Sequence, residues 1–571
     1  MWKFSKWNRK NVVIYILFCA IANLILLLEP LLFSKFINNL QNNWLTNENI
    51  WDLTWILFLM LSLVFVFWLF HWISRVLENK NAFIVNINYK AYLFEKTLNY
   101  NLSWHDDRQS WETIDKIDKA TRWLKEFSSN SFQIIEIIVR AVWTIFALIY
   151  FWFWMSIIVL LVIIISLYII FLFDKKLIPQ YDSINIFENK ISAKIYDSLS
   201  NITSIIILNI KKLVLKDVKK SFHLPQKVYY KNIVLNEIKW FVWNVLLRCV
   251  TVFPIIYYVW YHYTTTNAIQ IWDVSALYLY LNNLSLVFFW FSWLYWQIIV
   301  QKSYLENAWD IENGRIENIE NMKNAVWKFR WLEIKNLYFS YKENDPTIKN
   351  INLNIKSWEK IALIWASGSW KTTLLKIMHS LLPFSKWELV VNDKVYNDFT
   401  QIDLKTTLVP QEPELFTATI LENITFWLDY TVEKVKYFTD LACFTEVIEK
   451  LPNWFESTVN EKWVNLSWWQ KQRLALARAL LFAMNKEIIL LDESTSSVDP
   501  ENESKIYENI MKNFNEKTII SSIHKMNLLK FFDRIIMFDN WIIVDYGSFE
   551  YLLKNNKKFS RLWKDFIDKE K

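Results

Sequence analysis

The feature that most constrains the fold of this 571-residue chain is a set of long apolar stretches confined to its first half. Each is long enough to cross a hydrocarbon core of about 30 Å as a helix. Residues 141–173 carry no charge and would make a single helix of about 50 Å, so we expect a helical hairpin that turns near residues 152–156. Six membrane-spanning helices are therefore predicted, over residues 11–36, 53–73, 132–152, 156–173, 238–261 and 274–300.

The loops between these stretches predict how the chain is oriented. Residues 41–50 and 262–272 contain no Lys or Arg, whereas the N-terminus and residues 74–131 and 174–239 are rich in both. By the positive-inside rule the N-terminus and both long segments are cytosolic. An even number of spans returns the chain to the cytosol, so we expect a multi-pass protein of the plasma membrane whose C-terminal half is also cytosolic.

Three charged residues fall within or beside the apolar stretches, where charge is costly. They are Arg248 and the i,i+4 pair Glu136 and Arg140. Two interpretations are open: the residues lie near the cytosolic interface on helices that continue beyond the bilayer, or they line a cavity that binds a substrate.

Length and composition set the domain organisation. A chain of 571 residues is too long for one core, and 53% hydrophobic residues exclude disorder. The net charge of +7 suggests no nucleic-acid partner, and 3 cysteines far apart support neither a disulfide framework nor a metal cluster. We predict a multidomain protein: an all-α six-span transmembrane domain over residues 1–305, a linker over 306–328, and an α/β domain over 329–571.

The α/β domain contains a phosphate-binding pattern in a strand, loop and helix context. A P-loop reads G-x-x-x-x-G-K-[ST], and residues 365–372 match it except that both glycines are Trp. Glycine is needed there because the loop backbone wraps its N–H groups around the phosphates. The predicted phosphate-binding residues are Trp365, Ala366, Ser367, Gly368, Ser369, Trp370, Lys371, Thr372 and Thr373.

The same substitution recurs in two further motifs. Ser467, Trp468, Trp469 and Gln470 precede a helix within LSWWQKQR, and a hydrophobic strand ends at Asp492 and Glu493. With Gly in place of Trp these segments read LSGGQKQR and IILLDEST. Three motifs in this order and spacing closely resemble the ATP-binding-cassette (ABC) transporter family. The resemblance covers the whole chain, because six spans followed by an α/β P-loop domain match the half-transporter arrangement of ABC exporters.

The glycine and tryptophan counts support this interpretation of the motifs. The chain has 3 Gly and 34 Trp, whereas ordinary usage would give roughly 40 Gly in a chain of this length. We hypothesise that most of the Trp residues are glycine in the natural protein, encoded by UGA codons that were read as Trp; Trp104 is a candidate for a genuine Trp. The alternative is that every Trp is real and the cassette is degenerate. UGG codons at Trp370, Trp468 and Trp469 would refute the recoding hypothesis.

The resemblance also implies a role for each motif residue. Tyr341 matches the aromatic residue that stacks on adenine, Glu493 the general base that polarises the attacking water, and His524 the residue that contacts the γ-phosphate. Asp499 matches the D-loop that links the two sites of a dimer. The implied cofactors are ATP and Mg²⁺, with the metal bound by Thr372, Gln411 and Asp492.

The resemblance implies a dimer, because in this family Ser467 to Gln470 complete the ATP site of a second cassette. We expect a homodimer; a pair with a related half-transporter is the alternative. Residues 458–463 resemble an exporter-specific element only in part, since Asn460 stands where the family has glycine.

Three functions compete: ATP-driven export, import by a fused transporter, and a non-transporting membrane protein with a degenerate cassette. The first is preferred. The cargo, whether a lipid, a peptide or an amphipathic small molecule, cannot be identified from the sequence. Phe288, Phe289 and Tyr295 would suit such a cargo, but aromatic residues also commonly face membrane lipid.

Overall fold

The computed structural model describes most of the chain. The described residues are 1–42, 47–106, 108, 110–151, 153–265, 269–313, 329–342, 345–365, 370–382, 386–396, 399–403, 405–459, 466–495, 498–539 and 542–570. Two compact units are present, one formed by Met1–Asn99 with Arg108–Gly314 and the other by Tyr100–Asp107 with Arg315–Lys571.

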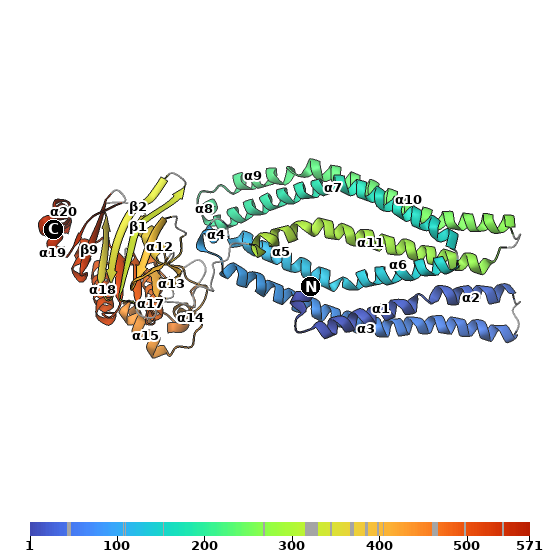
Figure 1. Ribbon diagram of the computed structural model, residues 1–571, viewed down its shortest axis with the longest axis horizontal. Coiled ribbons are helices and arrows are strands. Elements are labelled where there is room, and N and C mark those ends of the chain that lie inside the picture. The colour runs from blue at the N-terminus through green and yellow to red at the C-terminus, as the bar shows by residue number, and fades with distance from the viewer. Residues whose placement is uncertain are drawn as a thin grey trace. The chain divides into compact units, whose positions relative to one another are not determined.

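The first unit is helical, and its long helices lie side by side (Figure 1). After a short 3₁₀ helix at Trp2–Ser5, its helices are α1 (Arg9–Leu26), α2 (Glu29–Asn42), α3 (Asn47–Leu98), α5 (Ser110–Ser129), α6 (Ser131–Phe151), α7 (Phe153–Ser200), α8 (Ile202–Ile207), α9 (Lys211–His223), α10 (Gln226–Thr265) and α11 (Ile271–Glu312). Helix α4 (Leu102–Asp106) belongs to the second unit.

Six helical segments of the described chain are long and apolar enough to cross a membrane, which confirms the predicted number of spans. They are Arg9–Gln41, Ile50–Leu98, Ser110–Ile149, Phe153–Ser200, Lys211–Thr265 and Ile271–Gln297. The first is interrupted between α1 and α2, because Pro30 has no N–H to donate to the carbonyl four residues earlier.

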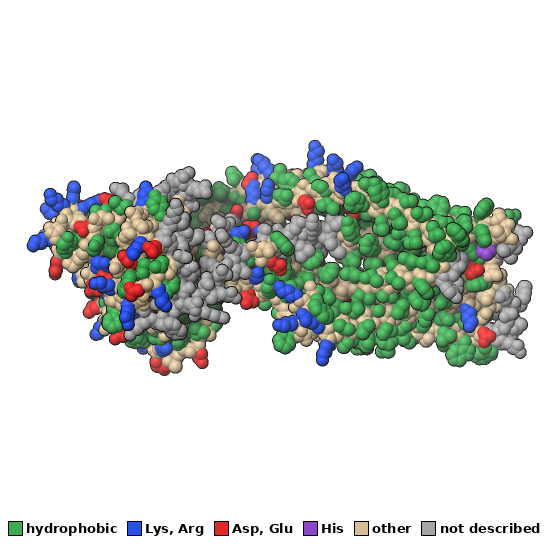
Figure 2. All heavy atoms as spheres, in the orientation of Figure 1, with side chains coloured by type: hydrophobic (Ala, Val, Ile, Leu, Met, Phe, Trp, Pro, Cys, Tyr) green, Lys and Arg blue, Asp and Glu red, His purple; other side chains and the backbone are tan. Residues whose placement is uncertain are grey.

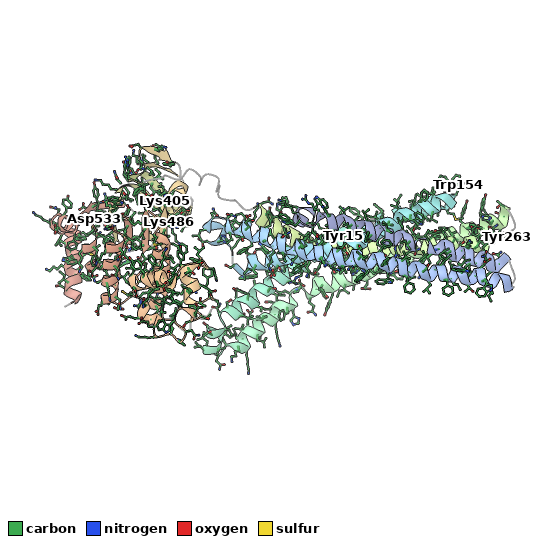
Figure 3. The ribbon with its side chains drawn as sticks, turned by 90° about the horizontal axis from the view of Figure 1, so that it is seen from below. Tyr15, Trp154, Tyr263, Lys405, Lys486 and Asp533 are labelled. Atoms are coloured by element: carbon green, nitrogen blue, oxygen red, sulfur yellow. The ribbon has the colours of Figure 1, made fainter. Side chains whose placement is uncertain are left out.

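The predicted hairpin in the long apolar run is also confirmed. Helix α6 ends at Phe151 and α7 begins at Phe153, and the two pack against each other; Trp152 itself lies outside the described residues. Figure 3 places Trp154, near the start of α7, and Tyr263, near the end of α10, at the same end of the unit. That end carries the loops that lack Lys and Arg.

The surface of the first unit fits a lipid environment. Large apolar side chains cover much of the face shown in Figure 2, and Phe65, Phe241 and Trp154 are each 70% exposed. A water-soluble protein rarely exposes so much contiguous apolar surface. This unit is therefore a multi-pass membrane domain.

The second unit contains two sheets and their covering helices (Figure 1). Its strands are β1 (Trp331–Lys342), β2 (Asp345–Lys356), β3 (Lys360–Trp365), β4 (Lys386–Val391), β5 (Lys394–Tyr396), β6 (Thr406–Val409), β7 (Ile488–Asp492), β8 (Thr518–Ser522), β9 (Arg534–Asp539) and β10 (Ile542–Gly547). Its helices, besides α4, are α12 (Trp370–Met378), α13 (Thr400–Asp403), α14 (Ile420–Thr425), α15 (Val432–Leu441), α16 (Thr445–Ile448), α17 (Trp468–Ala483), α18 (Pro500–Asn513), α19 (Phe549–Asn555) and α20 (Lys557–Glu570), with 3₁₀ helices at Trp454–Glu456 and Met526–Phe531.

The larger sheet has the strand order β10-β9-β3-β8-β7-β6 and is parallel except for β10. The smaller sheet, in the order β2-β1-β4-β5, is antiparallel. Side chains alternate across the larger sheet, so that Ile489 and Leu491 of β7 enter one core while Ile488 and Leu490 enter the other. Burial on both faces explains why these strands are continuously hydrophobic. The predicted α/β domain is confirmed.

Candidate functional site

The site lies at the carboxyl ends of the central parallel strands of the second unit. Strand β3 ends at Trp365 and α12 begins at Trp370, so Lys371 stands in the first turn of the helix. Lys371 is 2% exposed. The N–H groups of a helix N-terminus lack intrahelical partners and favour an anion. The strand and the helix predicted within residues 360–373 are therefore present, while residues 366–369 between them lie outside the described part of the chain.

Parallel pairing of β7 with β8 brings the predicted acids to the same edge. Asp492 lies opposite Ser522 in this pairing. The Ser522 hydroxyl donates to Asp492 Oδ1 at 2.9 Å and accepts from the Glu493 N–H at 2.9 Å. Thr372 of α12 also hydrogen-bonds to Asp492. Ser522 is a site residue that the sequence analysis missed, because only the strand register reveals it.

Lys371, Glu493 and His524 converge on one point. Lys371 Nζ lies 3.1 Å from Glu493 Oε1 and 2.8 Å from His524 Nε2, and His524 Nε2 also contacts Glu493 Oε1. Nε2 can accept from Lys371 only when unprotonated and donate to Glu493 only when protonated. The position of one proton therefore decides which neighbour His524 binds.

The charged groups of the site have perturbed pKa values. Burial alone would raise the pKa of Glu493, but the His524 hydrogen bond and the Lys371 charge outweigh it and lower that pKa. Burial lowers the pKa of Lys371, and Glu493 opposes this shift. Burial raises the pKa of Asp492 against hydrogen bonds from Thr372 and Ser522. Clustered shifts of this kind are typical of functional sites.

Glu493 also has an unusual backbone. Its φ is 45°, in the left-handed region that residues other than Gly, Asn and Asp seldom adopt. The Ser522 hydroxyl bonded to its N–H holds this conformation. The strain aims the carboxylate at Lys371 and His524 instead of continuing the strand.

Gln411 joins the site from the segment that follows β6. Its Nε2 donates to Glu493 Oε2 at 3.0 Å. Its backbone carbonyl accepts from Gln472 Nε2 of α17 at 3.2 Å. Gln472 therefore connects the predicted signature helix to Glu493, the predicted general base, through Gln411, a link that the sequence did not predict.

Ser467 caps the N-terminus of α17 together with Gln470. Its hydroxyl accepts from the Gln470 N–H, and the Gln470 side chain accepts from the Ser467 N–H, which forms a capping box. Trp468 and Trp469 are 47% and 37% exposed, and the Arg473 guanidinium lies 4.4 Å from the centre of a Trp469 ring. The helix N-terminus and these two residues lie at the surface, where a second molecule can reach them.

Asp499 caps α18 by accepting from the Asn502 N–H. Further into α18, Glu503 is 2% exposed, accepts from Thr495 Oγ1 at 2.8 Å and pairs with Lys525 Nζ at 2.7 Å. Lys525 also donates to the Val498 carbonyl. Since Lys525 follows His524 directly, its pair with Glu503 fixes the segment carrying His524 to α18, and its bond to Val498 fixes that segment to the residue before Asp499. The sequence analysis did not identify it.

Several predicted residues fall outside the described part of the chain. The backbones of Tyr341, Trp365 and Trp370 are placed, but their side chains are not described. Residues 366–369, which include Ala366, Ser367, Gly368 and Ser369, and residues 460–465 are not described either. The structure therefore leaves the predicted adenine contact and most of the phosphate loop as predictions.

Oxygen donors suited to Mg²⁺ are present where they were predicted. The Thr372 hydroxyl and the Asp492 carboxylate lie within hydrogen-bond distance of each other. The described residues contain no group of three or more His, Cys, Asp or Glu side chains that could enclose a metal ion. This donor set fits Mg²⁺, which usually keeps several waters and uses one or two protein ligands beside phosphate oxygens.

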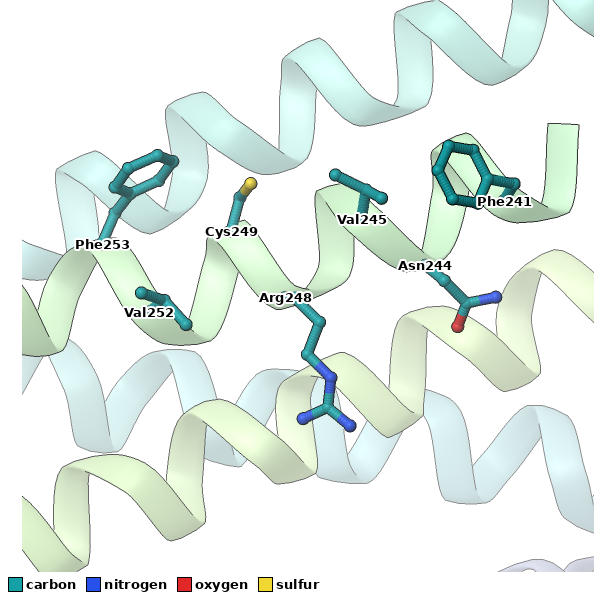
Figure 4. A pocket seen from close by; sticks show the side chains of 7 residues that line it. All are labelled: Phe241, Asn244, Val245, Arg248, Cys249, Val252 and Phe253. Carbon is teal, nitrogen blue, oxygen red and sulfur yellow. The ribbon is translucent and has the colours of Figure 1, made fainter. Parts of the chain in front are cut away.

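In the membrane unit, Arg140 pairs with Glu136 at 2.8 Å and donates to Asn23 of α1 at 3.3 Å. Arg248 lines a surface pocket of about 400 Å³ on α10 together with Asn244 and Phe241. Figure 4 shows Arg248 and Asn244 projecting from the same side of α10. Both interpretations of these charges therefore remain open.

Comparison with known proteins extends over both units. Residues 12–287 match the family model "ABC transporter transmembrane region", and residues 348–496 match "ABC transporter". The structure is similar to one described as a bacterial Atm1-family ABC exporter with ATP bound, with a TM-score of 0.87, 18% identity and 98% of each chain covered, which shows the fold.

Two curated relatives illustrate the sequence similarity. The lactococcin-G-processing and transport ATP-binding protein LagD of Lactococcus lactis is 36% identical over 43% of this chain and 35% of the relative. The ATP-binding cassette sub-family B member 6 of Mesocricetus auratus is 24% identical over 82% of this chain and 56% of the relative. The chain thus spans between about a third and just over half the length of these relatives.

Proposed function

Because the chain belongs to the ABC transporter family in both its transmembrane and its ATP-binding regions, we propose that it is an exporter-type half-transporter that hydrolyses ATP as a dimer. The convergence of Lys371, Glu493 and His524 carries this proposal. It brings together a phosphate-binding cation, a general base and a hydrogen-bonding partner from three separate elements. The cargo is a lipid, a peptide or an amphipathic small molecule, moved across the plasma membrane from the cytosolic side.

The residues of the site act through proton and charge placement. The lowered pKa of Glu493 keeps it ionised at neutral pH, so it can accept a proton from the attacking water. Lys371 contacts Glu493 and His524, and its ammonium would pair with the phosphates of bound ATP. Thr372 and Asp492 would hold Mg²⁺. When bound, that ion would neutralise the negative charge that develops on the phosphate oxygens.

A second chain is required because the signature residues are not part of their own cassette's catalytic cluster. Ser467 and Gln470 satisfy each other at the α17 N-terminus, which leaves the adjoining backbone N–H groups at the surface. In a homodimer, this N-terminus would close over the phosphates bound by Lys371 of the other copy. Pairing with a related half-transporter is the alternative, and co-purification of two differently tagged copies distinguishes them.

We also propose that most Trp residues are glycine in the natural protein. Two observations support this. Trp358, Trp427 and Trp454 have φ values of 67°, 60° and 51°, in the region that glycine adopts without strain. The buried indole N–H groups of Trp143 and Trp243 lack hydrogen-bond partners, although a buried Trp usually finds one.

Other Trp residues have the surroundings of genuine ones. Trp104 is 8% exposed and its ring lies 4.7 Å from that of Tyr100. Trp296 donates its indole N–H to Tyr181 at 3.0 Å. Mass spectrometry of peptides from the natural protein, with sequencing of the codons, tests the distinction: Trp at position 370, 468 or 469 of the natural chain would contradict the proposal.

The function is tested on the full chain made with glycine at positions 365, 370, 468 and 469. We expect ATP turnover that Glu493→Gln abolishes, while Glu508→Gln, which changes an exposed carboxylate on α18, leaves it intact. Unchanged turnover in Glu493→Gln would identify another base. Absence of turnover in the glycine-containing protein would favour the degenerate-cassette alternative. Uptake into inside-out vesicles indicates export, and loss of a preloaded cargo from them indicates import.

A further inference from the structure

A cavity whose largely apolar wall carries a few polar and charged side chains lies between α2 and α11 of the membrane unit, at the end that bears the loops without Lys or Arg. Its volume is about 220 Å³, and its lining includes Ser34, Lys35, Asn38, Asp273 and Tyr280. At ~30 Å³ per molecule this is room for about seven waters, or one small polar group. The positive-inside rule places this cavity at the outer membrane surface.

Lys35 is unusual for its position in the chain. It is the one Lys or Arg between Lys10 and Arg75, and its side chain is exposed on α2. A lone cation on the outer side works against the charge bias that orients the protein. It needs a function or a partner to account for it.

Asp273 supplies the opposite charge to the same cavity from the first turn of α11. The Tyr258 hydroxyl donates to its Oδ2 at 3.0 Å, which fixes the direction of the carboxylate. Lys35 and Asp273 line one cavity, and among the described residues the structure shows no ion pair between the two. The two charges are therefore available to two ends of a ligand.

Ser34 and Tyr280 also belong to the lining of the cavity. Ser34 donates to the residue 272 carbonyl at 3.2 Å, which ties α2 to α11 whatever side chain residue 272 carries. Tyr280 is 1% exposed, and its hydroxyl lies near the residue 143 side chain without forming a hydrogen bond to it.

We propose that this cavity binds a small zwitterion, with its anionic oxygens on Lys35 and its primary ammonium on Asp273. Ammonium and phosphate groups of the phosphoethanolamine type fit the charges and the volume. Such a group could belong to a membrane lipid or to a free solute leaving the transporter. The proposal deepens the export function by naming a class of ligand that binds at the outer end of the transporter. It rests on the export function only if the ligand is a free solute that leaves the transporter.

The test measures binding to the full chain without ATP, so its outcome is independent of whether the cassette hydrolyses ATP. The protein is placed in phosphatidylcholine nanodiscs, because the quaternary ammonium of this host lipid has no N–H to donate to Asp273. Labelled phosphoethanolamine is added to one sample, and phosphatidylethanolamine is incorporated into the discs of another. Phosphatidylethanolamine that stays bound to the protein after the discs are dissolved in detergent, with no binding in the first sample, identifies a lipid site. Binding of free phosphoethanolamine in the first sample identifies a solute site.

Variants decide whether the cavity is responsible. Lys35→Gln and Asp273→Asn should each weaken binding about tenfold or more, as expected for losing one charge-assisted contact. Lys35→Arg should retain it. Asp52→Asn, which removes an exposed acid from α3 on the same side, is the matched control and should bind as the wild type does. Retention of neither probe by the wild type, or equal binding in all variants, would overturn the proposal.

Discussion

Three left-handed positions allow a sharp test of whether this fold requires glycine where the sequence shows tryptophan. Trp358, Trp427 and Trp454 all lie in the cassette with φ between 51° and 67°. Comparing Gly with Ala at each position isolates the backbone, because both substitutions remove the same indole. Ala in this region costs about 1–2 kcal/mol, and its lower unfolded-state entropy returns about 0.4–1 kcal/mol.

Glycine should therefore be favoured by about 0.5–1 kcal/mol at each site, or roughly 2 kcal/mol for the triple variant if the sites act independently. For a domain of this size that corresponds to a midpoint difference of roughly 4–8 °C. The assay is thermal unfolding of the full chain carrying Gly or Ala at all three positions. The control is Trp563 in the middle of α20. There the Ala variant should be more stable than the Gly variant by about 1 kcal/mol, because the backbone is helical.

The sign of the difference is the decisive result. A triple-Ala protein as stable as the triple-Gly protein, or more so, would refute the argument that these positions demand glycine. A preference for Gly at Trp563 as well would show that the assay reports something other than backbone conformation.

The remaining predictions concern the cassette. Glu493→Gln should lower the ATPase rate at least about 100-fold, measured as phosphate release, because the general base is lost. The same variant leaves Lys371 without its carboxylate partner, so its free energy of unfolding should be lower than that of the wild type above pH 4.5. Because folding lowers the pKa of Glu493, this difference in stability should shrink as the pH falls below 4.5. A difference that persists or grows would contradict the pairing of Glu493 with Lys371. Lys525→Met leaves the buried Glu503 carboxylate without its partly exposed partner and should cost about 2 kcal/mol, a fall in thermal midpoint of roughly 4–8 °C. Lys525→Arg should keep most of the stability, and equal midpoints would show that the pair is dispensable.

What the sequence could predict of the site depended on spacing along the chain. Lys371 with Thr372, and Asp492 with Glu493, are neighbours in sequence, so a motif identifies each pair. Ser522 acts through the parallel pairing of β7 with β8, and that register is set by packing on both faces of the sheet. The pair of Lys525 with the buried Glu503 likewise needs the three-dimensional fold, because its members are separated by most of α18 and β8.

The membrane unit shows the same limit in a different form. Hydropathy predicts where six helices cross, because the bilayer requires a minimum apolar length, but it says nothing of how each helix is rotated about its axis. In the sequence, Glu78 is a single acid on the long helix α3. In the structure it is fully buried, and its carboxylate accepts from the Phe132 N–H at 2.7 Å, which caps α6. Lys239 of α10 and Asp174 of α7 form a buried pair at 2.7 Å.

These buried contacts have a mechanical consequence. Breaking a buried ion pair by removing one partner costs about 3–5 kcal/mol, because an uncompensated charge remains in the interior. Sliding α7 past α10 would impose a similar cost, since Lys239 and Asp174 are each almost fully shielded from any other partner. Helices α7 and α10 are therefore expected to move as one body during any transport cycle, and α3 with α6 as another, joined through Glu78. Conformational change within the unit is then expected at contacts without such pairs. Between α2 and α11, Ser34 donates to the residue 272 carbonyl, and this hydrogen bond costs less to break than a buried ion pair.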